Sequence, residues 1–372
     1  MSRPVPFVNF PAQFAEERDE IMAAVEGVFA RGEFVGGPDV ALLESELAAA
    51  IAVPHVVAVN SGTDALILGM RALGLGPGDE VITPPNSFVA STSAIVAVGA
   101  TPVFADVLPD QTIDPERVAA AITPRTRAVM VVHLTGRIAD MDAIGAVARR
   151  HGLFVIEDAA QSMGSRYRDR MSGAFGDIGC FSAHPLKNLN AAGDAGFITT
   201  PHDQVAEKAR LYRTIGLKDR NTVVEWGTVS RLDTLQAAIL RLRLRRLPSV
   251  IERRRRNAAL YRARLDPAHV FAPPCLDHEF NTFHTFVVQV ERRDDLQRFL
   301  TGRGIGTGVH YPVPIHLQPV ARALGHGPGS FPVTEAQAGR ILSLPIHQFL
   351  DEDDIATVCD AIAAFHATGT EG

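Results

Sequence analysis

The chain has 372 residues, of which 46% are hydrophobic and 21% charged, and its formal net charge of −6 argues against a general nucleic-acid binder. It contains no run of about 18 apolar residues and no N-terminal apolar core, so we expect neither a membrane span nor a secretory leader. Three scattered cysteines without metal-ligand spacing fit a reducing compartment. We therefore expect a cytoplasmic protein without a metal site.

The first two-thirds of the chain alternates short apolar runs with amphipathic segments. Strands are predicted at 55–60, 79–84, 101–107, 127–134, 153–160 and 177–184. Helices are predicted between them at 64–73, 91–99, 114–122 and 141–152. This alternation predicts βαβ units and a mostly parallel sheet with helices on both faces, which is an α/β fold with three αβα layers.

The pattern changes near residue 235. Residues 234–265 read as one long helix interrupted at Pro248, and beyond about 270 strands, helices and Pro/Gly-rich loops mix. We therefore expect a large αβα domain at 1–247 and a smaller α+β domain at 248–372. The arginine-rich part, 241–256, is interpreted as a solvated helix face rather than a nucleic-acid site, because no aromatic residues interleave it.

Lysine is rare in this chain. Of 36 basic residues only Lys187, Lys208 and Lys218 are lysines, and the rest are arginines. Lysine can lose its proton and form an imine with a carbonyl, which arginine cannot do. Lys208 and Lys218 lie among charged residues, as surface lysines do. Lys187 lies among small and apolar residues in "FSAHPLKNLNAAGDAG", where a chemical role is the better hypothesis.

Two further segments follow predicted strands, where open α/β sheets place their sites. In "VNSGTDAL" (59–66), small and hydroxyl residues precede a helix, an arrangement that suits a phosphate as well as a simple helix cap by Ser61 or Thr63. In "FVIEDAAQS" (154–162), Glu157 and Asp158 end a strand and Gln161 follows. A buried acid there suits a cationic ring nitrogen or a metal, or it caps a helix.

Together these residues match the requirements of pyridoxal 5'-phosphate (PLP). This cofactor is held as a lysine Schiff base, with an acid at its pyridine nitrogen. Lys187 is the amine and Asp158 the acid, the 59–66 segment offers a phosphate site, and Phe88 in "PPNSFVAS" is an aromatic ring for stacking.

The sequence resembles the PLP-dependent sugar aminotransferases of the DegT/DnrJ/StrS type over about residues 30–350. The matching segments are "VNSGTDAL", "GATPVFADV", "HLTGRIADMDAI", "VIEDAAQSMGS", "FGDIGCFSAHPLKNLNAAGDAGFITT", "SRLDTLQAAIL" and "HYPVPIHLQP…FPVTEAQAGRILSLP", in family order. The resemblance implies fold type I and a cytoplasmic homodimer with active sites at the subunit interface.

The resemblance also implies a role for each matching residue. Lys187 is the Schiff-base lysine and moves the proton, while Asp158 pairs with the pyridine nitrogen. Gln161 contacts the ring hydroxyl and Phe88 stacks on the ring. The phosphate is bound by Gly62, Thr63 and Ser182. Some relatives carry histidine in place of the lysine and perform deoxygenation, so Lys187 favours transamination; His184 does not replace it.

One segment departs from the commoner family pattern, and a second could be mistaken for another motif. Many members carry an asparagine that reaches the partner subunit's cofactor phosphate, whereas "WGTVSRLD" has Val229 there. Ser230, Arg231 or another group takes over, or the contact is lost. The glycine-dense stretch 301–312 is interpreted as a turn and strand rather than a dinucleotide motif. This stretch leads to His310 and Tyr311, which we expect to lie near the substrate. The complete set of candidate substrate residues is His184, Arg231, His310, Tyr311 and His316.

We therefore expect a PLP-dependent transaminase that moves an amino group from an amino acid, with L-glutamate as the first candidate, to a keto sugar, with a nucleotide-linked one as the first candidate. Alternatives are a free keto sugar acid or a cyclitol ketone as substrate, glutamine as donor, and a PLP lyase or dehydratase on the same fold. A regulatory protein that retains the fold is the non-enzyme alternative. No nucleic-acid or membrane partner is expected.

Overall fold

The computed structural model describes residues 3–368, and its largest element is a seven-stranded sheet. The strand order is β1 (His55–Val59), β9 (Gly196–Thr200), β8 (Ile178–Ser182), β5 (Phe154–Asp158), β4 (Thr126–Val132), β2 (Glu80–Thr83) and β3 (Thr101–Phe104). Strand β9 runs antiparallel to both of its neighbours, and every other pairing is parallel. Six strands therefore end at one common edge, as the alternation of strands and helices predicts.

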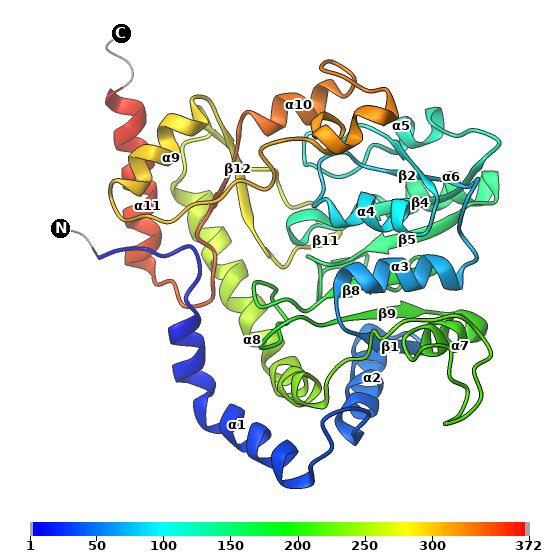
Figure 1. The fold of residues 1–372 in the computed structure, drawn as a ribbon. Coiled ribbons are helices and arrows are strands. Elements are labelled where there is room, and N and C mark those ends of the chain that lie inside the picture. The colour runs from blue at the N-terminus through cyan, green and yellow to red at the C-terminus, as the bar shows by residue number, and fades with distance from the viewer. Residues whose placement is uncertain (1–2, 369–372) are drawn as a thin grey trace.

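Helices cover both faces of this sheet (Figure 1). One face packs against α3 (Gly62–Ala72), α4 (Ala90–Ala97) and α7 (Asp203–Tyr212). The other packs against α2 (Pro38–Ile51), α5 (Pro115–Ala120), α6 (Met141–His151) and the first half of α8 (Thr234–Arg264). Along β1, Val57 faces the first core and Val56 the second, which is the two-residue alternation of a strand buried on both faces. The α/β class with three layers is confirmed.

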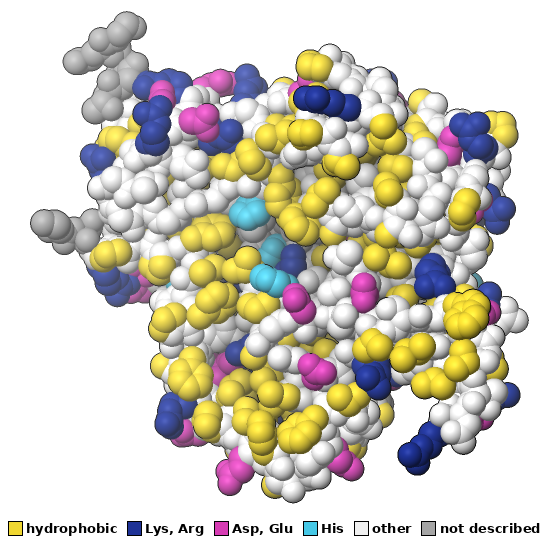
Figure 2. Space-filling model, viewed as in Figure 1, with side chains coloured by type: hydrophobic (Ala, Val, Ile, Leu, Met, Phe, Trp, Pro, Cys, Tyr) yellow, Lys and Arg dark blue, Asp and Glu magenta, His cyan; other side chains and the backbone are white. Residues whose placement is uncertain are grey.

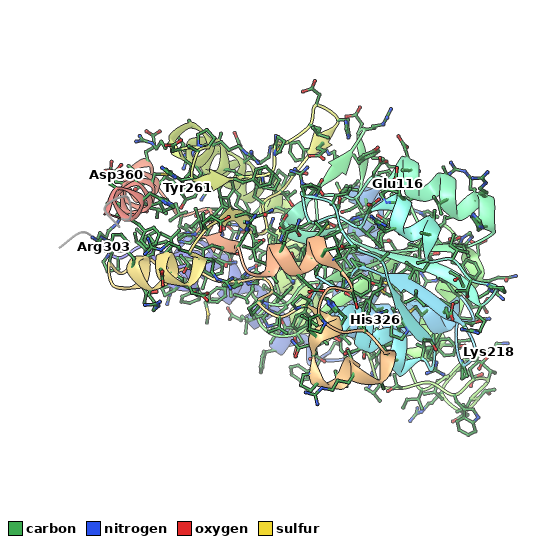
Figure 3. The ribbon with its side chains drawn as sticks, turned by 90° about the horizontal axis from the view of Figure 1, so that it is seen from above. Glu116, Lys218, Tyr261, Arg303, His326 and Asp360 are labelled. Atoms are coloured by element: carbon green, nitrogen blue, oxygen red, sulfur yellow. The ribbon has the colours of Figure 1, made fainter. Side chains whose placement is uncertain are left out.

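A second core lies around a three-stranded sheet of order β10 (Val270–Phe271), β12 (Phe286–Val290) and β13 (Ile341–Leu344). Helices α9 (Arg293–Thr301) and α11 (Glu352–Thr368) pack against it together with the end of α8. Tyr261 of α8 stacks on Phe286 at 5.0 Å between ring centroids; Figure 3 labels Tyr261 on this side of the molecule.

Helix α8 joins the two cores. It contacts α2 and α1 (Phe10–Arg31) on the side of the large sheet and α11 on the side of the second core, as Figure 1 shows. Pro248 lies inside the helix without ending it. The expected boundary at 247/248 therefore falls within one continuous helix, and the division into two domains stays a prediction.

The remaining elements are short. A small sheet joins β11 (Glu279–Phe280) to the hairpin of β6 (Arg166–Tyr167) and β7 (Arg170–Met171), linking the two parts of the chain. Helical turns follow at η1 (Leu134–Gly136), η2 (Ile315–Leu317) and η3 (Pro319–Leu324), and α10 (Pro332–Ala338) precedes β13. None of the helices in residues 3–368 is both long and apolar enough to cross a membrane.

Candidate active site

Lys187 lies in the turn between β8 and β9, at the common edge of the strands. Its backbone N–H donates to the carbonyl of His184 at 2.8 Å, which fixes the turn. Burial lowers the pKa of Lys187 to about 8, although the charge of Asp158 opposes this shift. A substantial fraction of the amine is therefore neutral near physiological pH, as a nucleophilic lysine requires. By contrast, Lys218 lies at the periphery of the molecule (Figure 3).

Asp158 is the last residue of β5 and is 6% exposed. Its Oδ2 accepts a hydrogen bond from the Ser91 hydroxyl at 2.6 Å, and its Oδ1 accepts one from the N–H of Ala160 at 3.2 Å. Burial raises the pKa of Asp158, while these hydrogen bonds and the charge of Lys187 act in the opposite sense. Within residues 3–368 it forms no ion pair with an arginine, so the carboxylate has capacity for a cationic ring nitrogen.

The neighbouring Glu157 points to the opposite face of β5. Its carboxylate accepts hydrogen bonds from the N–H groups of Gly173, Phe175 and Gly176, each at 2.7 Å. His133 Nε2 also lies 2.9 Å from the Glu157 carboxylate. This side chain therefore serves the loop that enters β8, and only Asp158 of the acidic pair faces the site.

Gln161, Tyr311 and Phe88 come together beside Asp158. Gln161 Oε1 accepts from the N–H of Thr135 at 2.8 Å, and its Nε2 donates to the Tyr311 hydroxyl at 3.3 Å. The Phe88 and Tyr311 rings lie 5.6 Å apart, and Phe88 is 55% exposed, so one face is free for another ring. Burial and the nearby Asp158 charge raise the pKa of Tyr311 to about 12.

The N-terminus of α3 lies against the end of β8, where the sequence predicts an anion cradle. Ser61 is the N-cap, because its hydroxyl accepts from the N–H of Asp64 at 3.1 Å. A Cβ at Gly62 would lie 2.6 Å from the Cβ of Ser182, so glycine lets α3 approach the end of β8. The first N–H groups of a helix have no partner in the helix. Together with the hydroxyls of Thr63 and Ser182, they suit a phosphate.

The side chains of residues 229–231 have different environments in the folded chain. Val229 is 55% exposed in the loop between α7 and α8 and bridges to Thr214. The buried Ser230 hydroxyl donates to Asn60 Oδ1 at 3.2 Å, so it is used inside its own subunit. Arg231 is exposed. Of Ser230 and Arg231, it is Arg231 whose side chain forms no hydrogen bond or ion pair with the part of the chain that the structure describes.

The candidate substrate histidines have three different environments. His184 is exposed beside Lys187. His310 Nδ1 lies 2.8 Å from the Ser343 hydroxyl, and burial and the Lys187 charge lower the pKa of His310. Figure 2 shows histidine side chains gathered around a hollow at the centre of this face. His316 is different, because it is 1% exposed.

His316 Nε2 lies 3.1 Å from the Glu335 carboxylate, and its ring packs edge-on against Phe331 at 4.7 Å. Its side chain therefore supports the loop around η2 and presents no surface to a substrate.

Sequence reasoning missed several residues at this site. Ser91 bonds Asp158, and its only sequence signal is its position three residues after Phe88 at the start of α4. His284 is half-buried, and burial and the charge of Lys187 hold its pKa well below its usual value. It comes from a segment about 100 residues away in sequence, so no local pattern marks it.

The residues present fit PLP. A buried acid without an ion pair, a lysine of lowered pKa, an exposed aromatic face and a helix N-terminus closed by Ser182 converge at one edge of the sheet. The donor set matches a ring nitrogen, an aldehyde carbon and a phosphate.

Comparisons with known proteins agree with this geometry. Residues 15–363 match the DegT/DnrJ/EryC1/StrS aminotransferase family. The chain is 44% identical over 360 residues to the dTDP-3-amino-3,4,6-trideoxy-alpha-D-glucose transaminase of Streptomyces venezuelae, covering 96% of this chain and 95% of that one. It is 41% identical over 366 residues to the "Pleiotropic regulatory protein" of Geobacillus stearothermophilus, covering 97% and 98%.

Two solved structures are similar throughout. The S. venezuelae DesV complex with a ketimine intermediate has a TM-score of 0.95 and 43% identity, covering 98% of this chain and 99% of that one. NtdA of Bacillus subtilis, solved with the bound cofactor PMP, has a TM-score of 0.88 and 31% identity, covering 97% and 86%. The chain therefore belongs to the DegT/DnrJ/EryC1/StrS aminotransferase family and is a PLP-dependent transaminase.

Proposed function

We propose that this transaminase moves the amino group of L-glutamate to the keto carbon of a nucleotide-linked sugar during amino-sugar biosynthesis. The observation that carries this proposal is the 44% identity, over nearly the whole length, to a transaminase of a dTDP-linked amino sugar. The Lys187–Asp158 pair required for transamination is present as well. When bound, PLP supplies an electron sink that makes the α-carbon of the donor acidic.

The side chains then have distinct tasks. Lys187 takes the proton from the donor α-carbon and delivers one at the sugar carbon that becomes aminated. Its pKa of about 8 suits both directions of transfer near neutral pH. Asp158, ionised through contact with a cationic nitrogen and the Ser91 hydroxyl, keeps that nitrogen protonated. Phe88 and Gln161 position the cofactor ring, and the cradle of Gly62, Thr63 and Ser182 holds its phosphate.

A second copy of the chain completes the site in this proposal. The loop between α7 and α8 carries exposed apolar residues, of which Trp226 is 85% exposed, and α1 exposes Phe10, Phe14, Met22 and Phe29. Apolar surface of this extent is typical of an interface between subunits. Analytical ultracentrifugation should find a dimer, and Trp226→Asp should shift it toward monomer. A wild-type monomer at micromolar concentration would contradict the homodimer.

The test of the activity is a substrate panel. The purified enzyme with PLP is incubated with glutamate or glutamine and with dTDP-linked, UDP-linked and free keto sugars or cyclitol ketones, and products are identified by mass spectrometry. An aminated nucleotide sugar is expected, with Lys187→Ala as the inactive control. Exclusive amination of a free ketone would overturn the nucleotide assignment. Release of a deaminated or dehydrated product would instead indicate a lyase or dehydratase.

A regulatory function is the second candidate, because one 41% identical relative carries a regulatory name. Cofactor binding and reactivity distinguish it from an enzyme. A borohydride-reducible, yellow protein whose spectrum changes with an amino donor supports the enzyme. A protein that neither binds PLP nor responds to any donor would favour regulation.

A further inference from the structure

Arg254 is a buried arginine of α8 without an acidic partner. It is 8% exposed, and one of its terminal nitrogens, Nη1, donates to the carbonyls of Phe283 at 3.0 Å and His284 at 3.1 Å. Its Nε is buried and has no hydrogen-bond partner. No carboxylate of residues 3–368 forms an ion pair with it, and burial alone lowers its pKa to about 10. A buried charge that lacks a partner is costly, which is the mark of a site awaiting an anion.

Arg254 lines a pocket that it shares with Lys187. The pocket holds about 40 Å³, several times the roughly 10–15 Å³ needed by one water. The side-chain amides of Asn188 and Gln348 also line it, and each has a buried oxygen without a partner. Asn188 Nδ2 already donates to the carbonyl of Thr282 at 3.2 Å, which fixes that amide. Gln348 forms no hydrogen bond with the described residues, so its amide can turn either its oxygen or its NH₂ group into the pocket.

The remaining charged groups of the pocket are already neutralised. Arg243 pairs with Glu17 at 2.8 Å, and Arg246 pairs with Glu16 and Glu20. Glu17 is the sole acidic residue among those that line the pocket within residues 3–368. The charge of Lys187 is partly balanced by Asp158. Among the cations that line the pocket, Arg254 is therefore the one without an acidic partner in the described residues.

His284 connects Arg254 to the reacting end of the site. Burial is the largest influence on its lowered pKa, and the positive charges of Lys187 and Arg254 add to it. Arg254 Nη1 contacts the His284 carbonyl at 3.1 Å, and the charge of Lys187 acts on the imidazole of the same residue. A small molecule whose amine-bearing carbon is held beside Lys187 can extend along His284 toward the guanidinium.

We propose that Arg254, with the amide NH₂ group of Gln348, binds a carboxylate of the amino-acid donor. The inference rests on the proposed transamination and adds the residue that recognises the donor. A guanidinium offers planar, charge-assisted hydrogen bonds that match a carboxylate, and a buried setting strengthens them. The carboxylate comes either from the α-carbon or from the side chain of a dicarboxylic donor, and both sources share this chemistry.

Binding of unreactive acids tests the site without turnover. Glutarate and acetate, which lack amine and keto groups, are titrated into the PLP-loaded enzyme by calorimetry. We expect Arg254→Gln to weaken glutarate binding about 10- to 100-fold, the range typical of a lost hydrogen bond to a charged group. Arg254→Lys should restore part of the affinity. Arg253→Gln, on the same helix but only half-buried and paired with Glu16, is the matched control and should leave it unchanged.

A second variant tests the same site in case Arg254→Gln does not fold. Gln348→Glu adds a carboxylate beside Arg254 without removing a hydrogen bond, and should exclude donor acids by filling the site. The KM for glutamate should rise at least tenfold while kcat changes little. If the KM for alanine rises equally, the bound group is the α-carboxylate; if alanine is unaffected, it is the side-chain carboxylate.

Three results would overturn this inference: no glutarate binding to the wild type, equal binding by Arg254→Gln, or an effect of Gln348→Glu on the keto sugar rather than on the donor. A wild-type enzyme that reacts with no amino acid would contradict the proposed function instead.

Discussion

The hydroxyl of Ser91 donates to Asp158 Oδ2 at 2.6 Å, so the first turn of α4 stabilises the charge at the end of β5. This bond opposes the rise in the pKa of Asp158 that burial causes. Without it, Asp158 protonates at a higher pH and holds a cationic nitrogen less well.

We therefore expect Ser91→Ala to weaken PLP affinity roughly tenfold, because a hydrogen bond to a charged group contributes roughly 1.5–3 kcal/mol. The acid limb of PLP affinity should move to higher pH, which fluorescence titration of the apoenzyme at several pH values would detect. Ser93→Ala, an exposed serine on the same helix, is the control. Equal affinities for both variants across the pH range would refute the role of Ser91.

Removal of Lys187 should abolish turnover. A positioned proton-transfer group typically contributes ~10²–10⁴-fold, and Lys187 also forms the Schiff base, so Lys187→Ala should lose at least that factor. The visible absorbance of the lysine–PLP Schiff base should disappear as well. Lys208→Ala should retain both properties, since that residue is exposed on α7. A Lys187→Ala protein that keeps activity and absorbance would disprove the assignment.

The lowered pKa of Lys187 predicts a pH-dependent stability of the apoenzyme. Its pKa is about 8 in the folded chain and 10.5 in the reference state. Between these values the unfolded chain binds more protons, so the free energy of unfolding rises with pH across this window. Below pH 8 the burial cost is fully present. Lys187→Met should therefore be more stable than wild type at pH 7, and the difference in urea midpoint should shrink toward pH 10.5. A constant difference would exclude the shift.

Gly62→Ala should damage the phosphate cradle. The added Cβ would lie 2.6 Å from the Cβ of Ser182, so α3 or β8 must move. Overpacking of this kind typically costs roughly 1–3 kcal/mol. We expect a lower melting temperature together with weaker PLP binding. Gly27→Ala is the matched control, because its nearest contact is the flexible end of Arg31 at 3.6 Å. Unaltered PLP affinity in Gly62→Ala would argue against the cradle.

Val229→Asn should strengthen cofactor retention if the dimer places this loop at the partner's phosphate. An amide N–H donates to phosphate, which the valine cannot do. The rate of PLP loss during dialysis should fall severalfold. Val223→Asn, an exposed valine in the same loop, should have no effect. An identical rate for all three proteins would show that residue 229 does not face the phosphate.

Much of the site was predictable because it follows the strands. Asp158 and Ser182 end β5 and β8, and parallel strands bring their carboxyl ends to one edge. The rare lysine, Lys187, follows at the same edge. Ser91 and Arg254 were not predictable. A serine early in a helix reads as surface or cap, and Arg254 stands in a run of four arginines with no pattern to single it out.

The sequence by itself determined the fold class, the lysine and the chemistry, because strand and helix periods and the rare amine are local properties. Only the tertiary structure decided which of two adjacent acids faces the site. Successive residues of a strand point to opposite faces, so Glu157 is saturated by backbone N–H groups while Asp158 remains available. The tertiary structure also decided the partners of Arg254. Packing between distant segments places backbone carbonyls beside its guanidinium instead of a carboxylate.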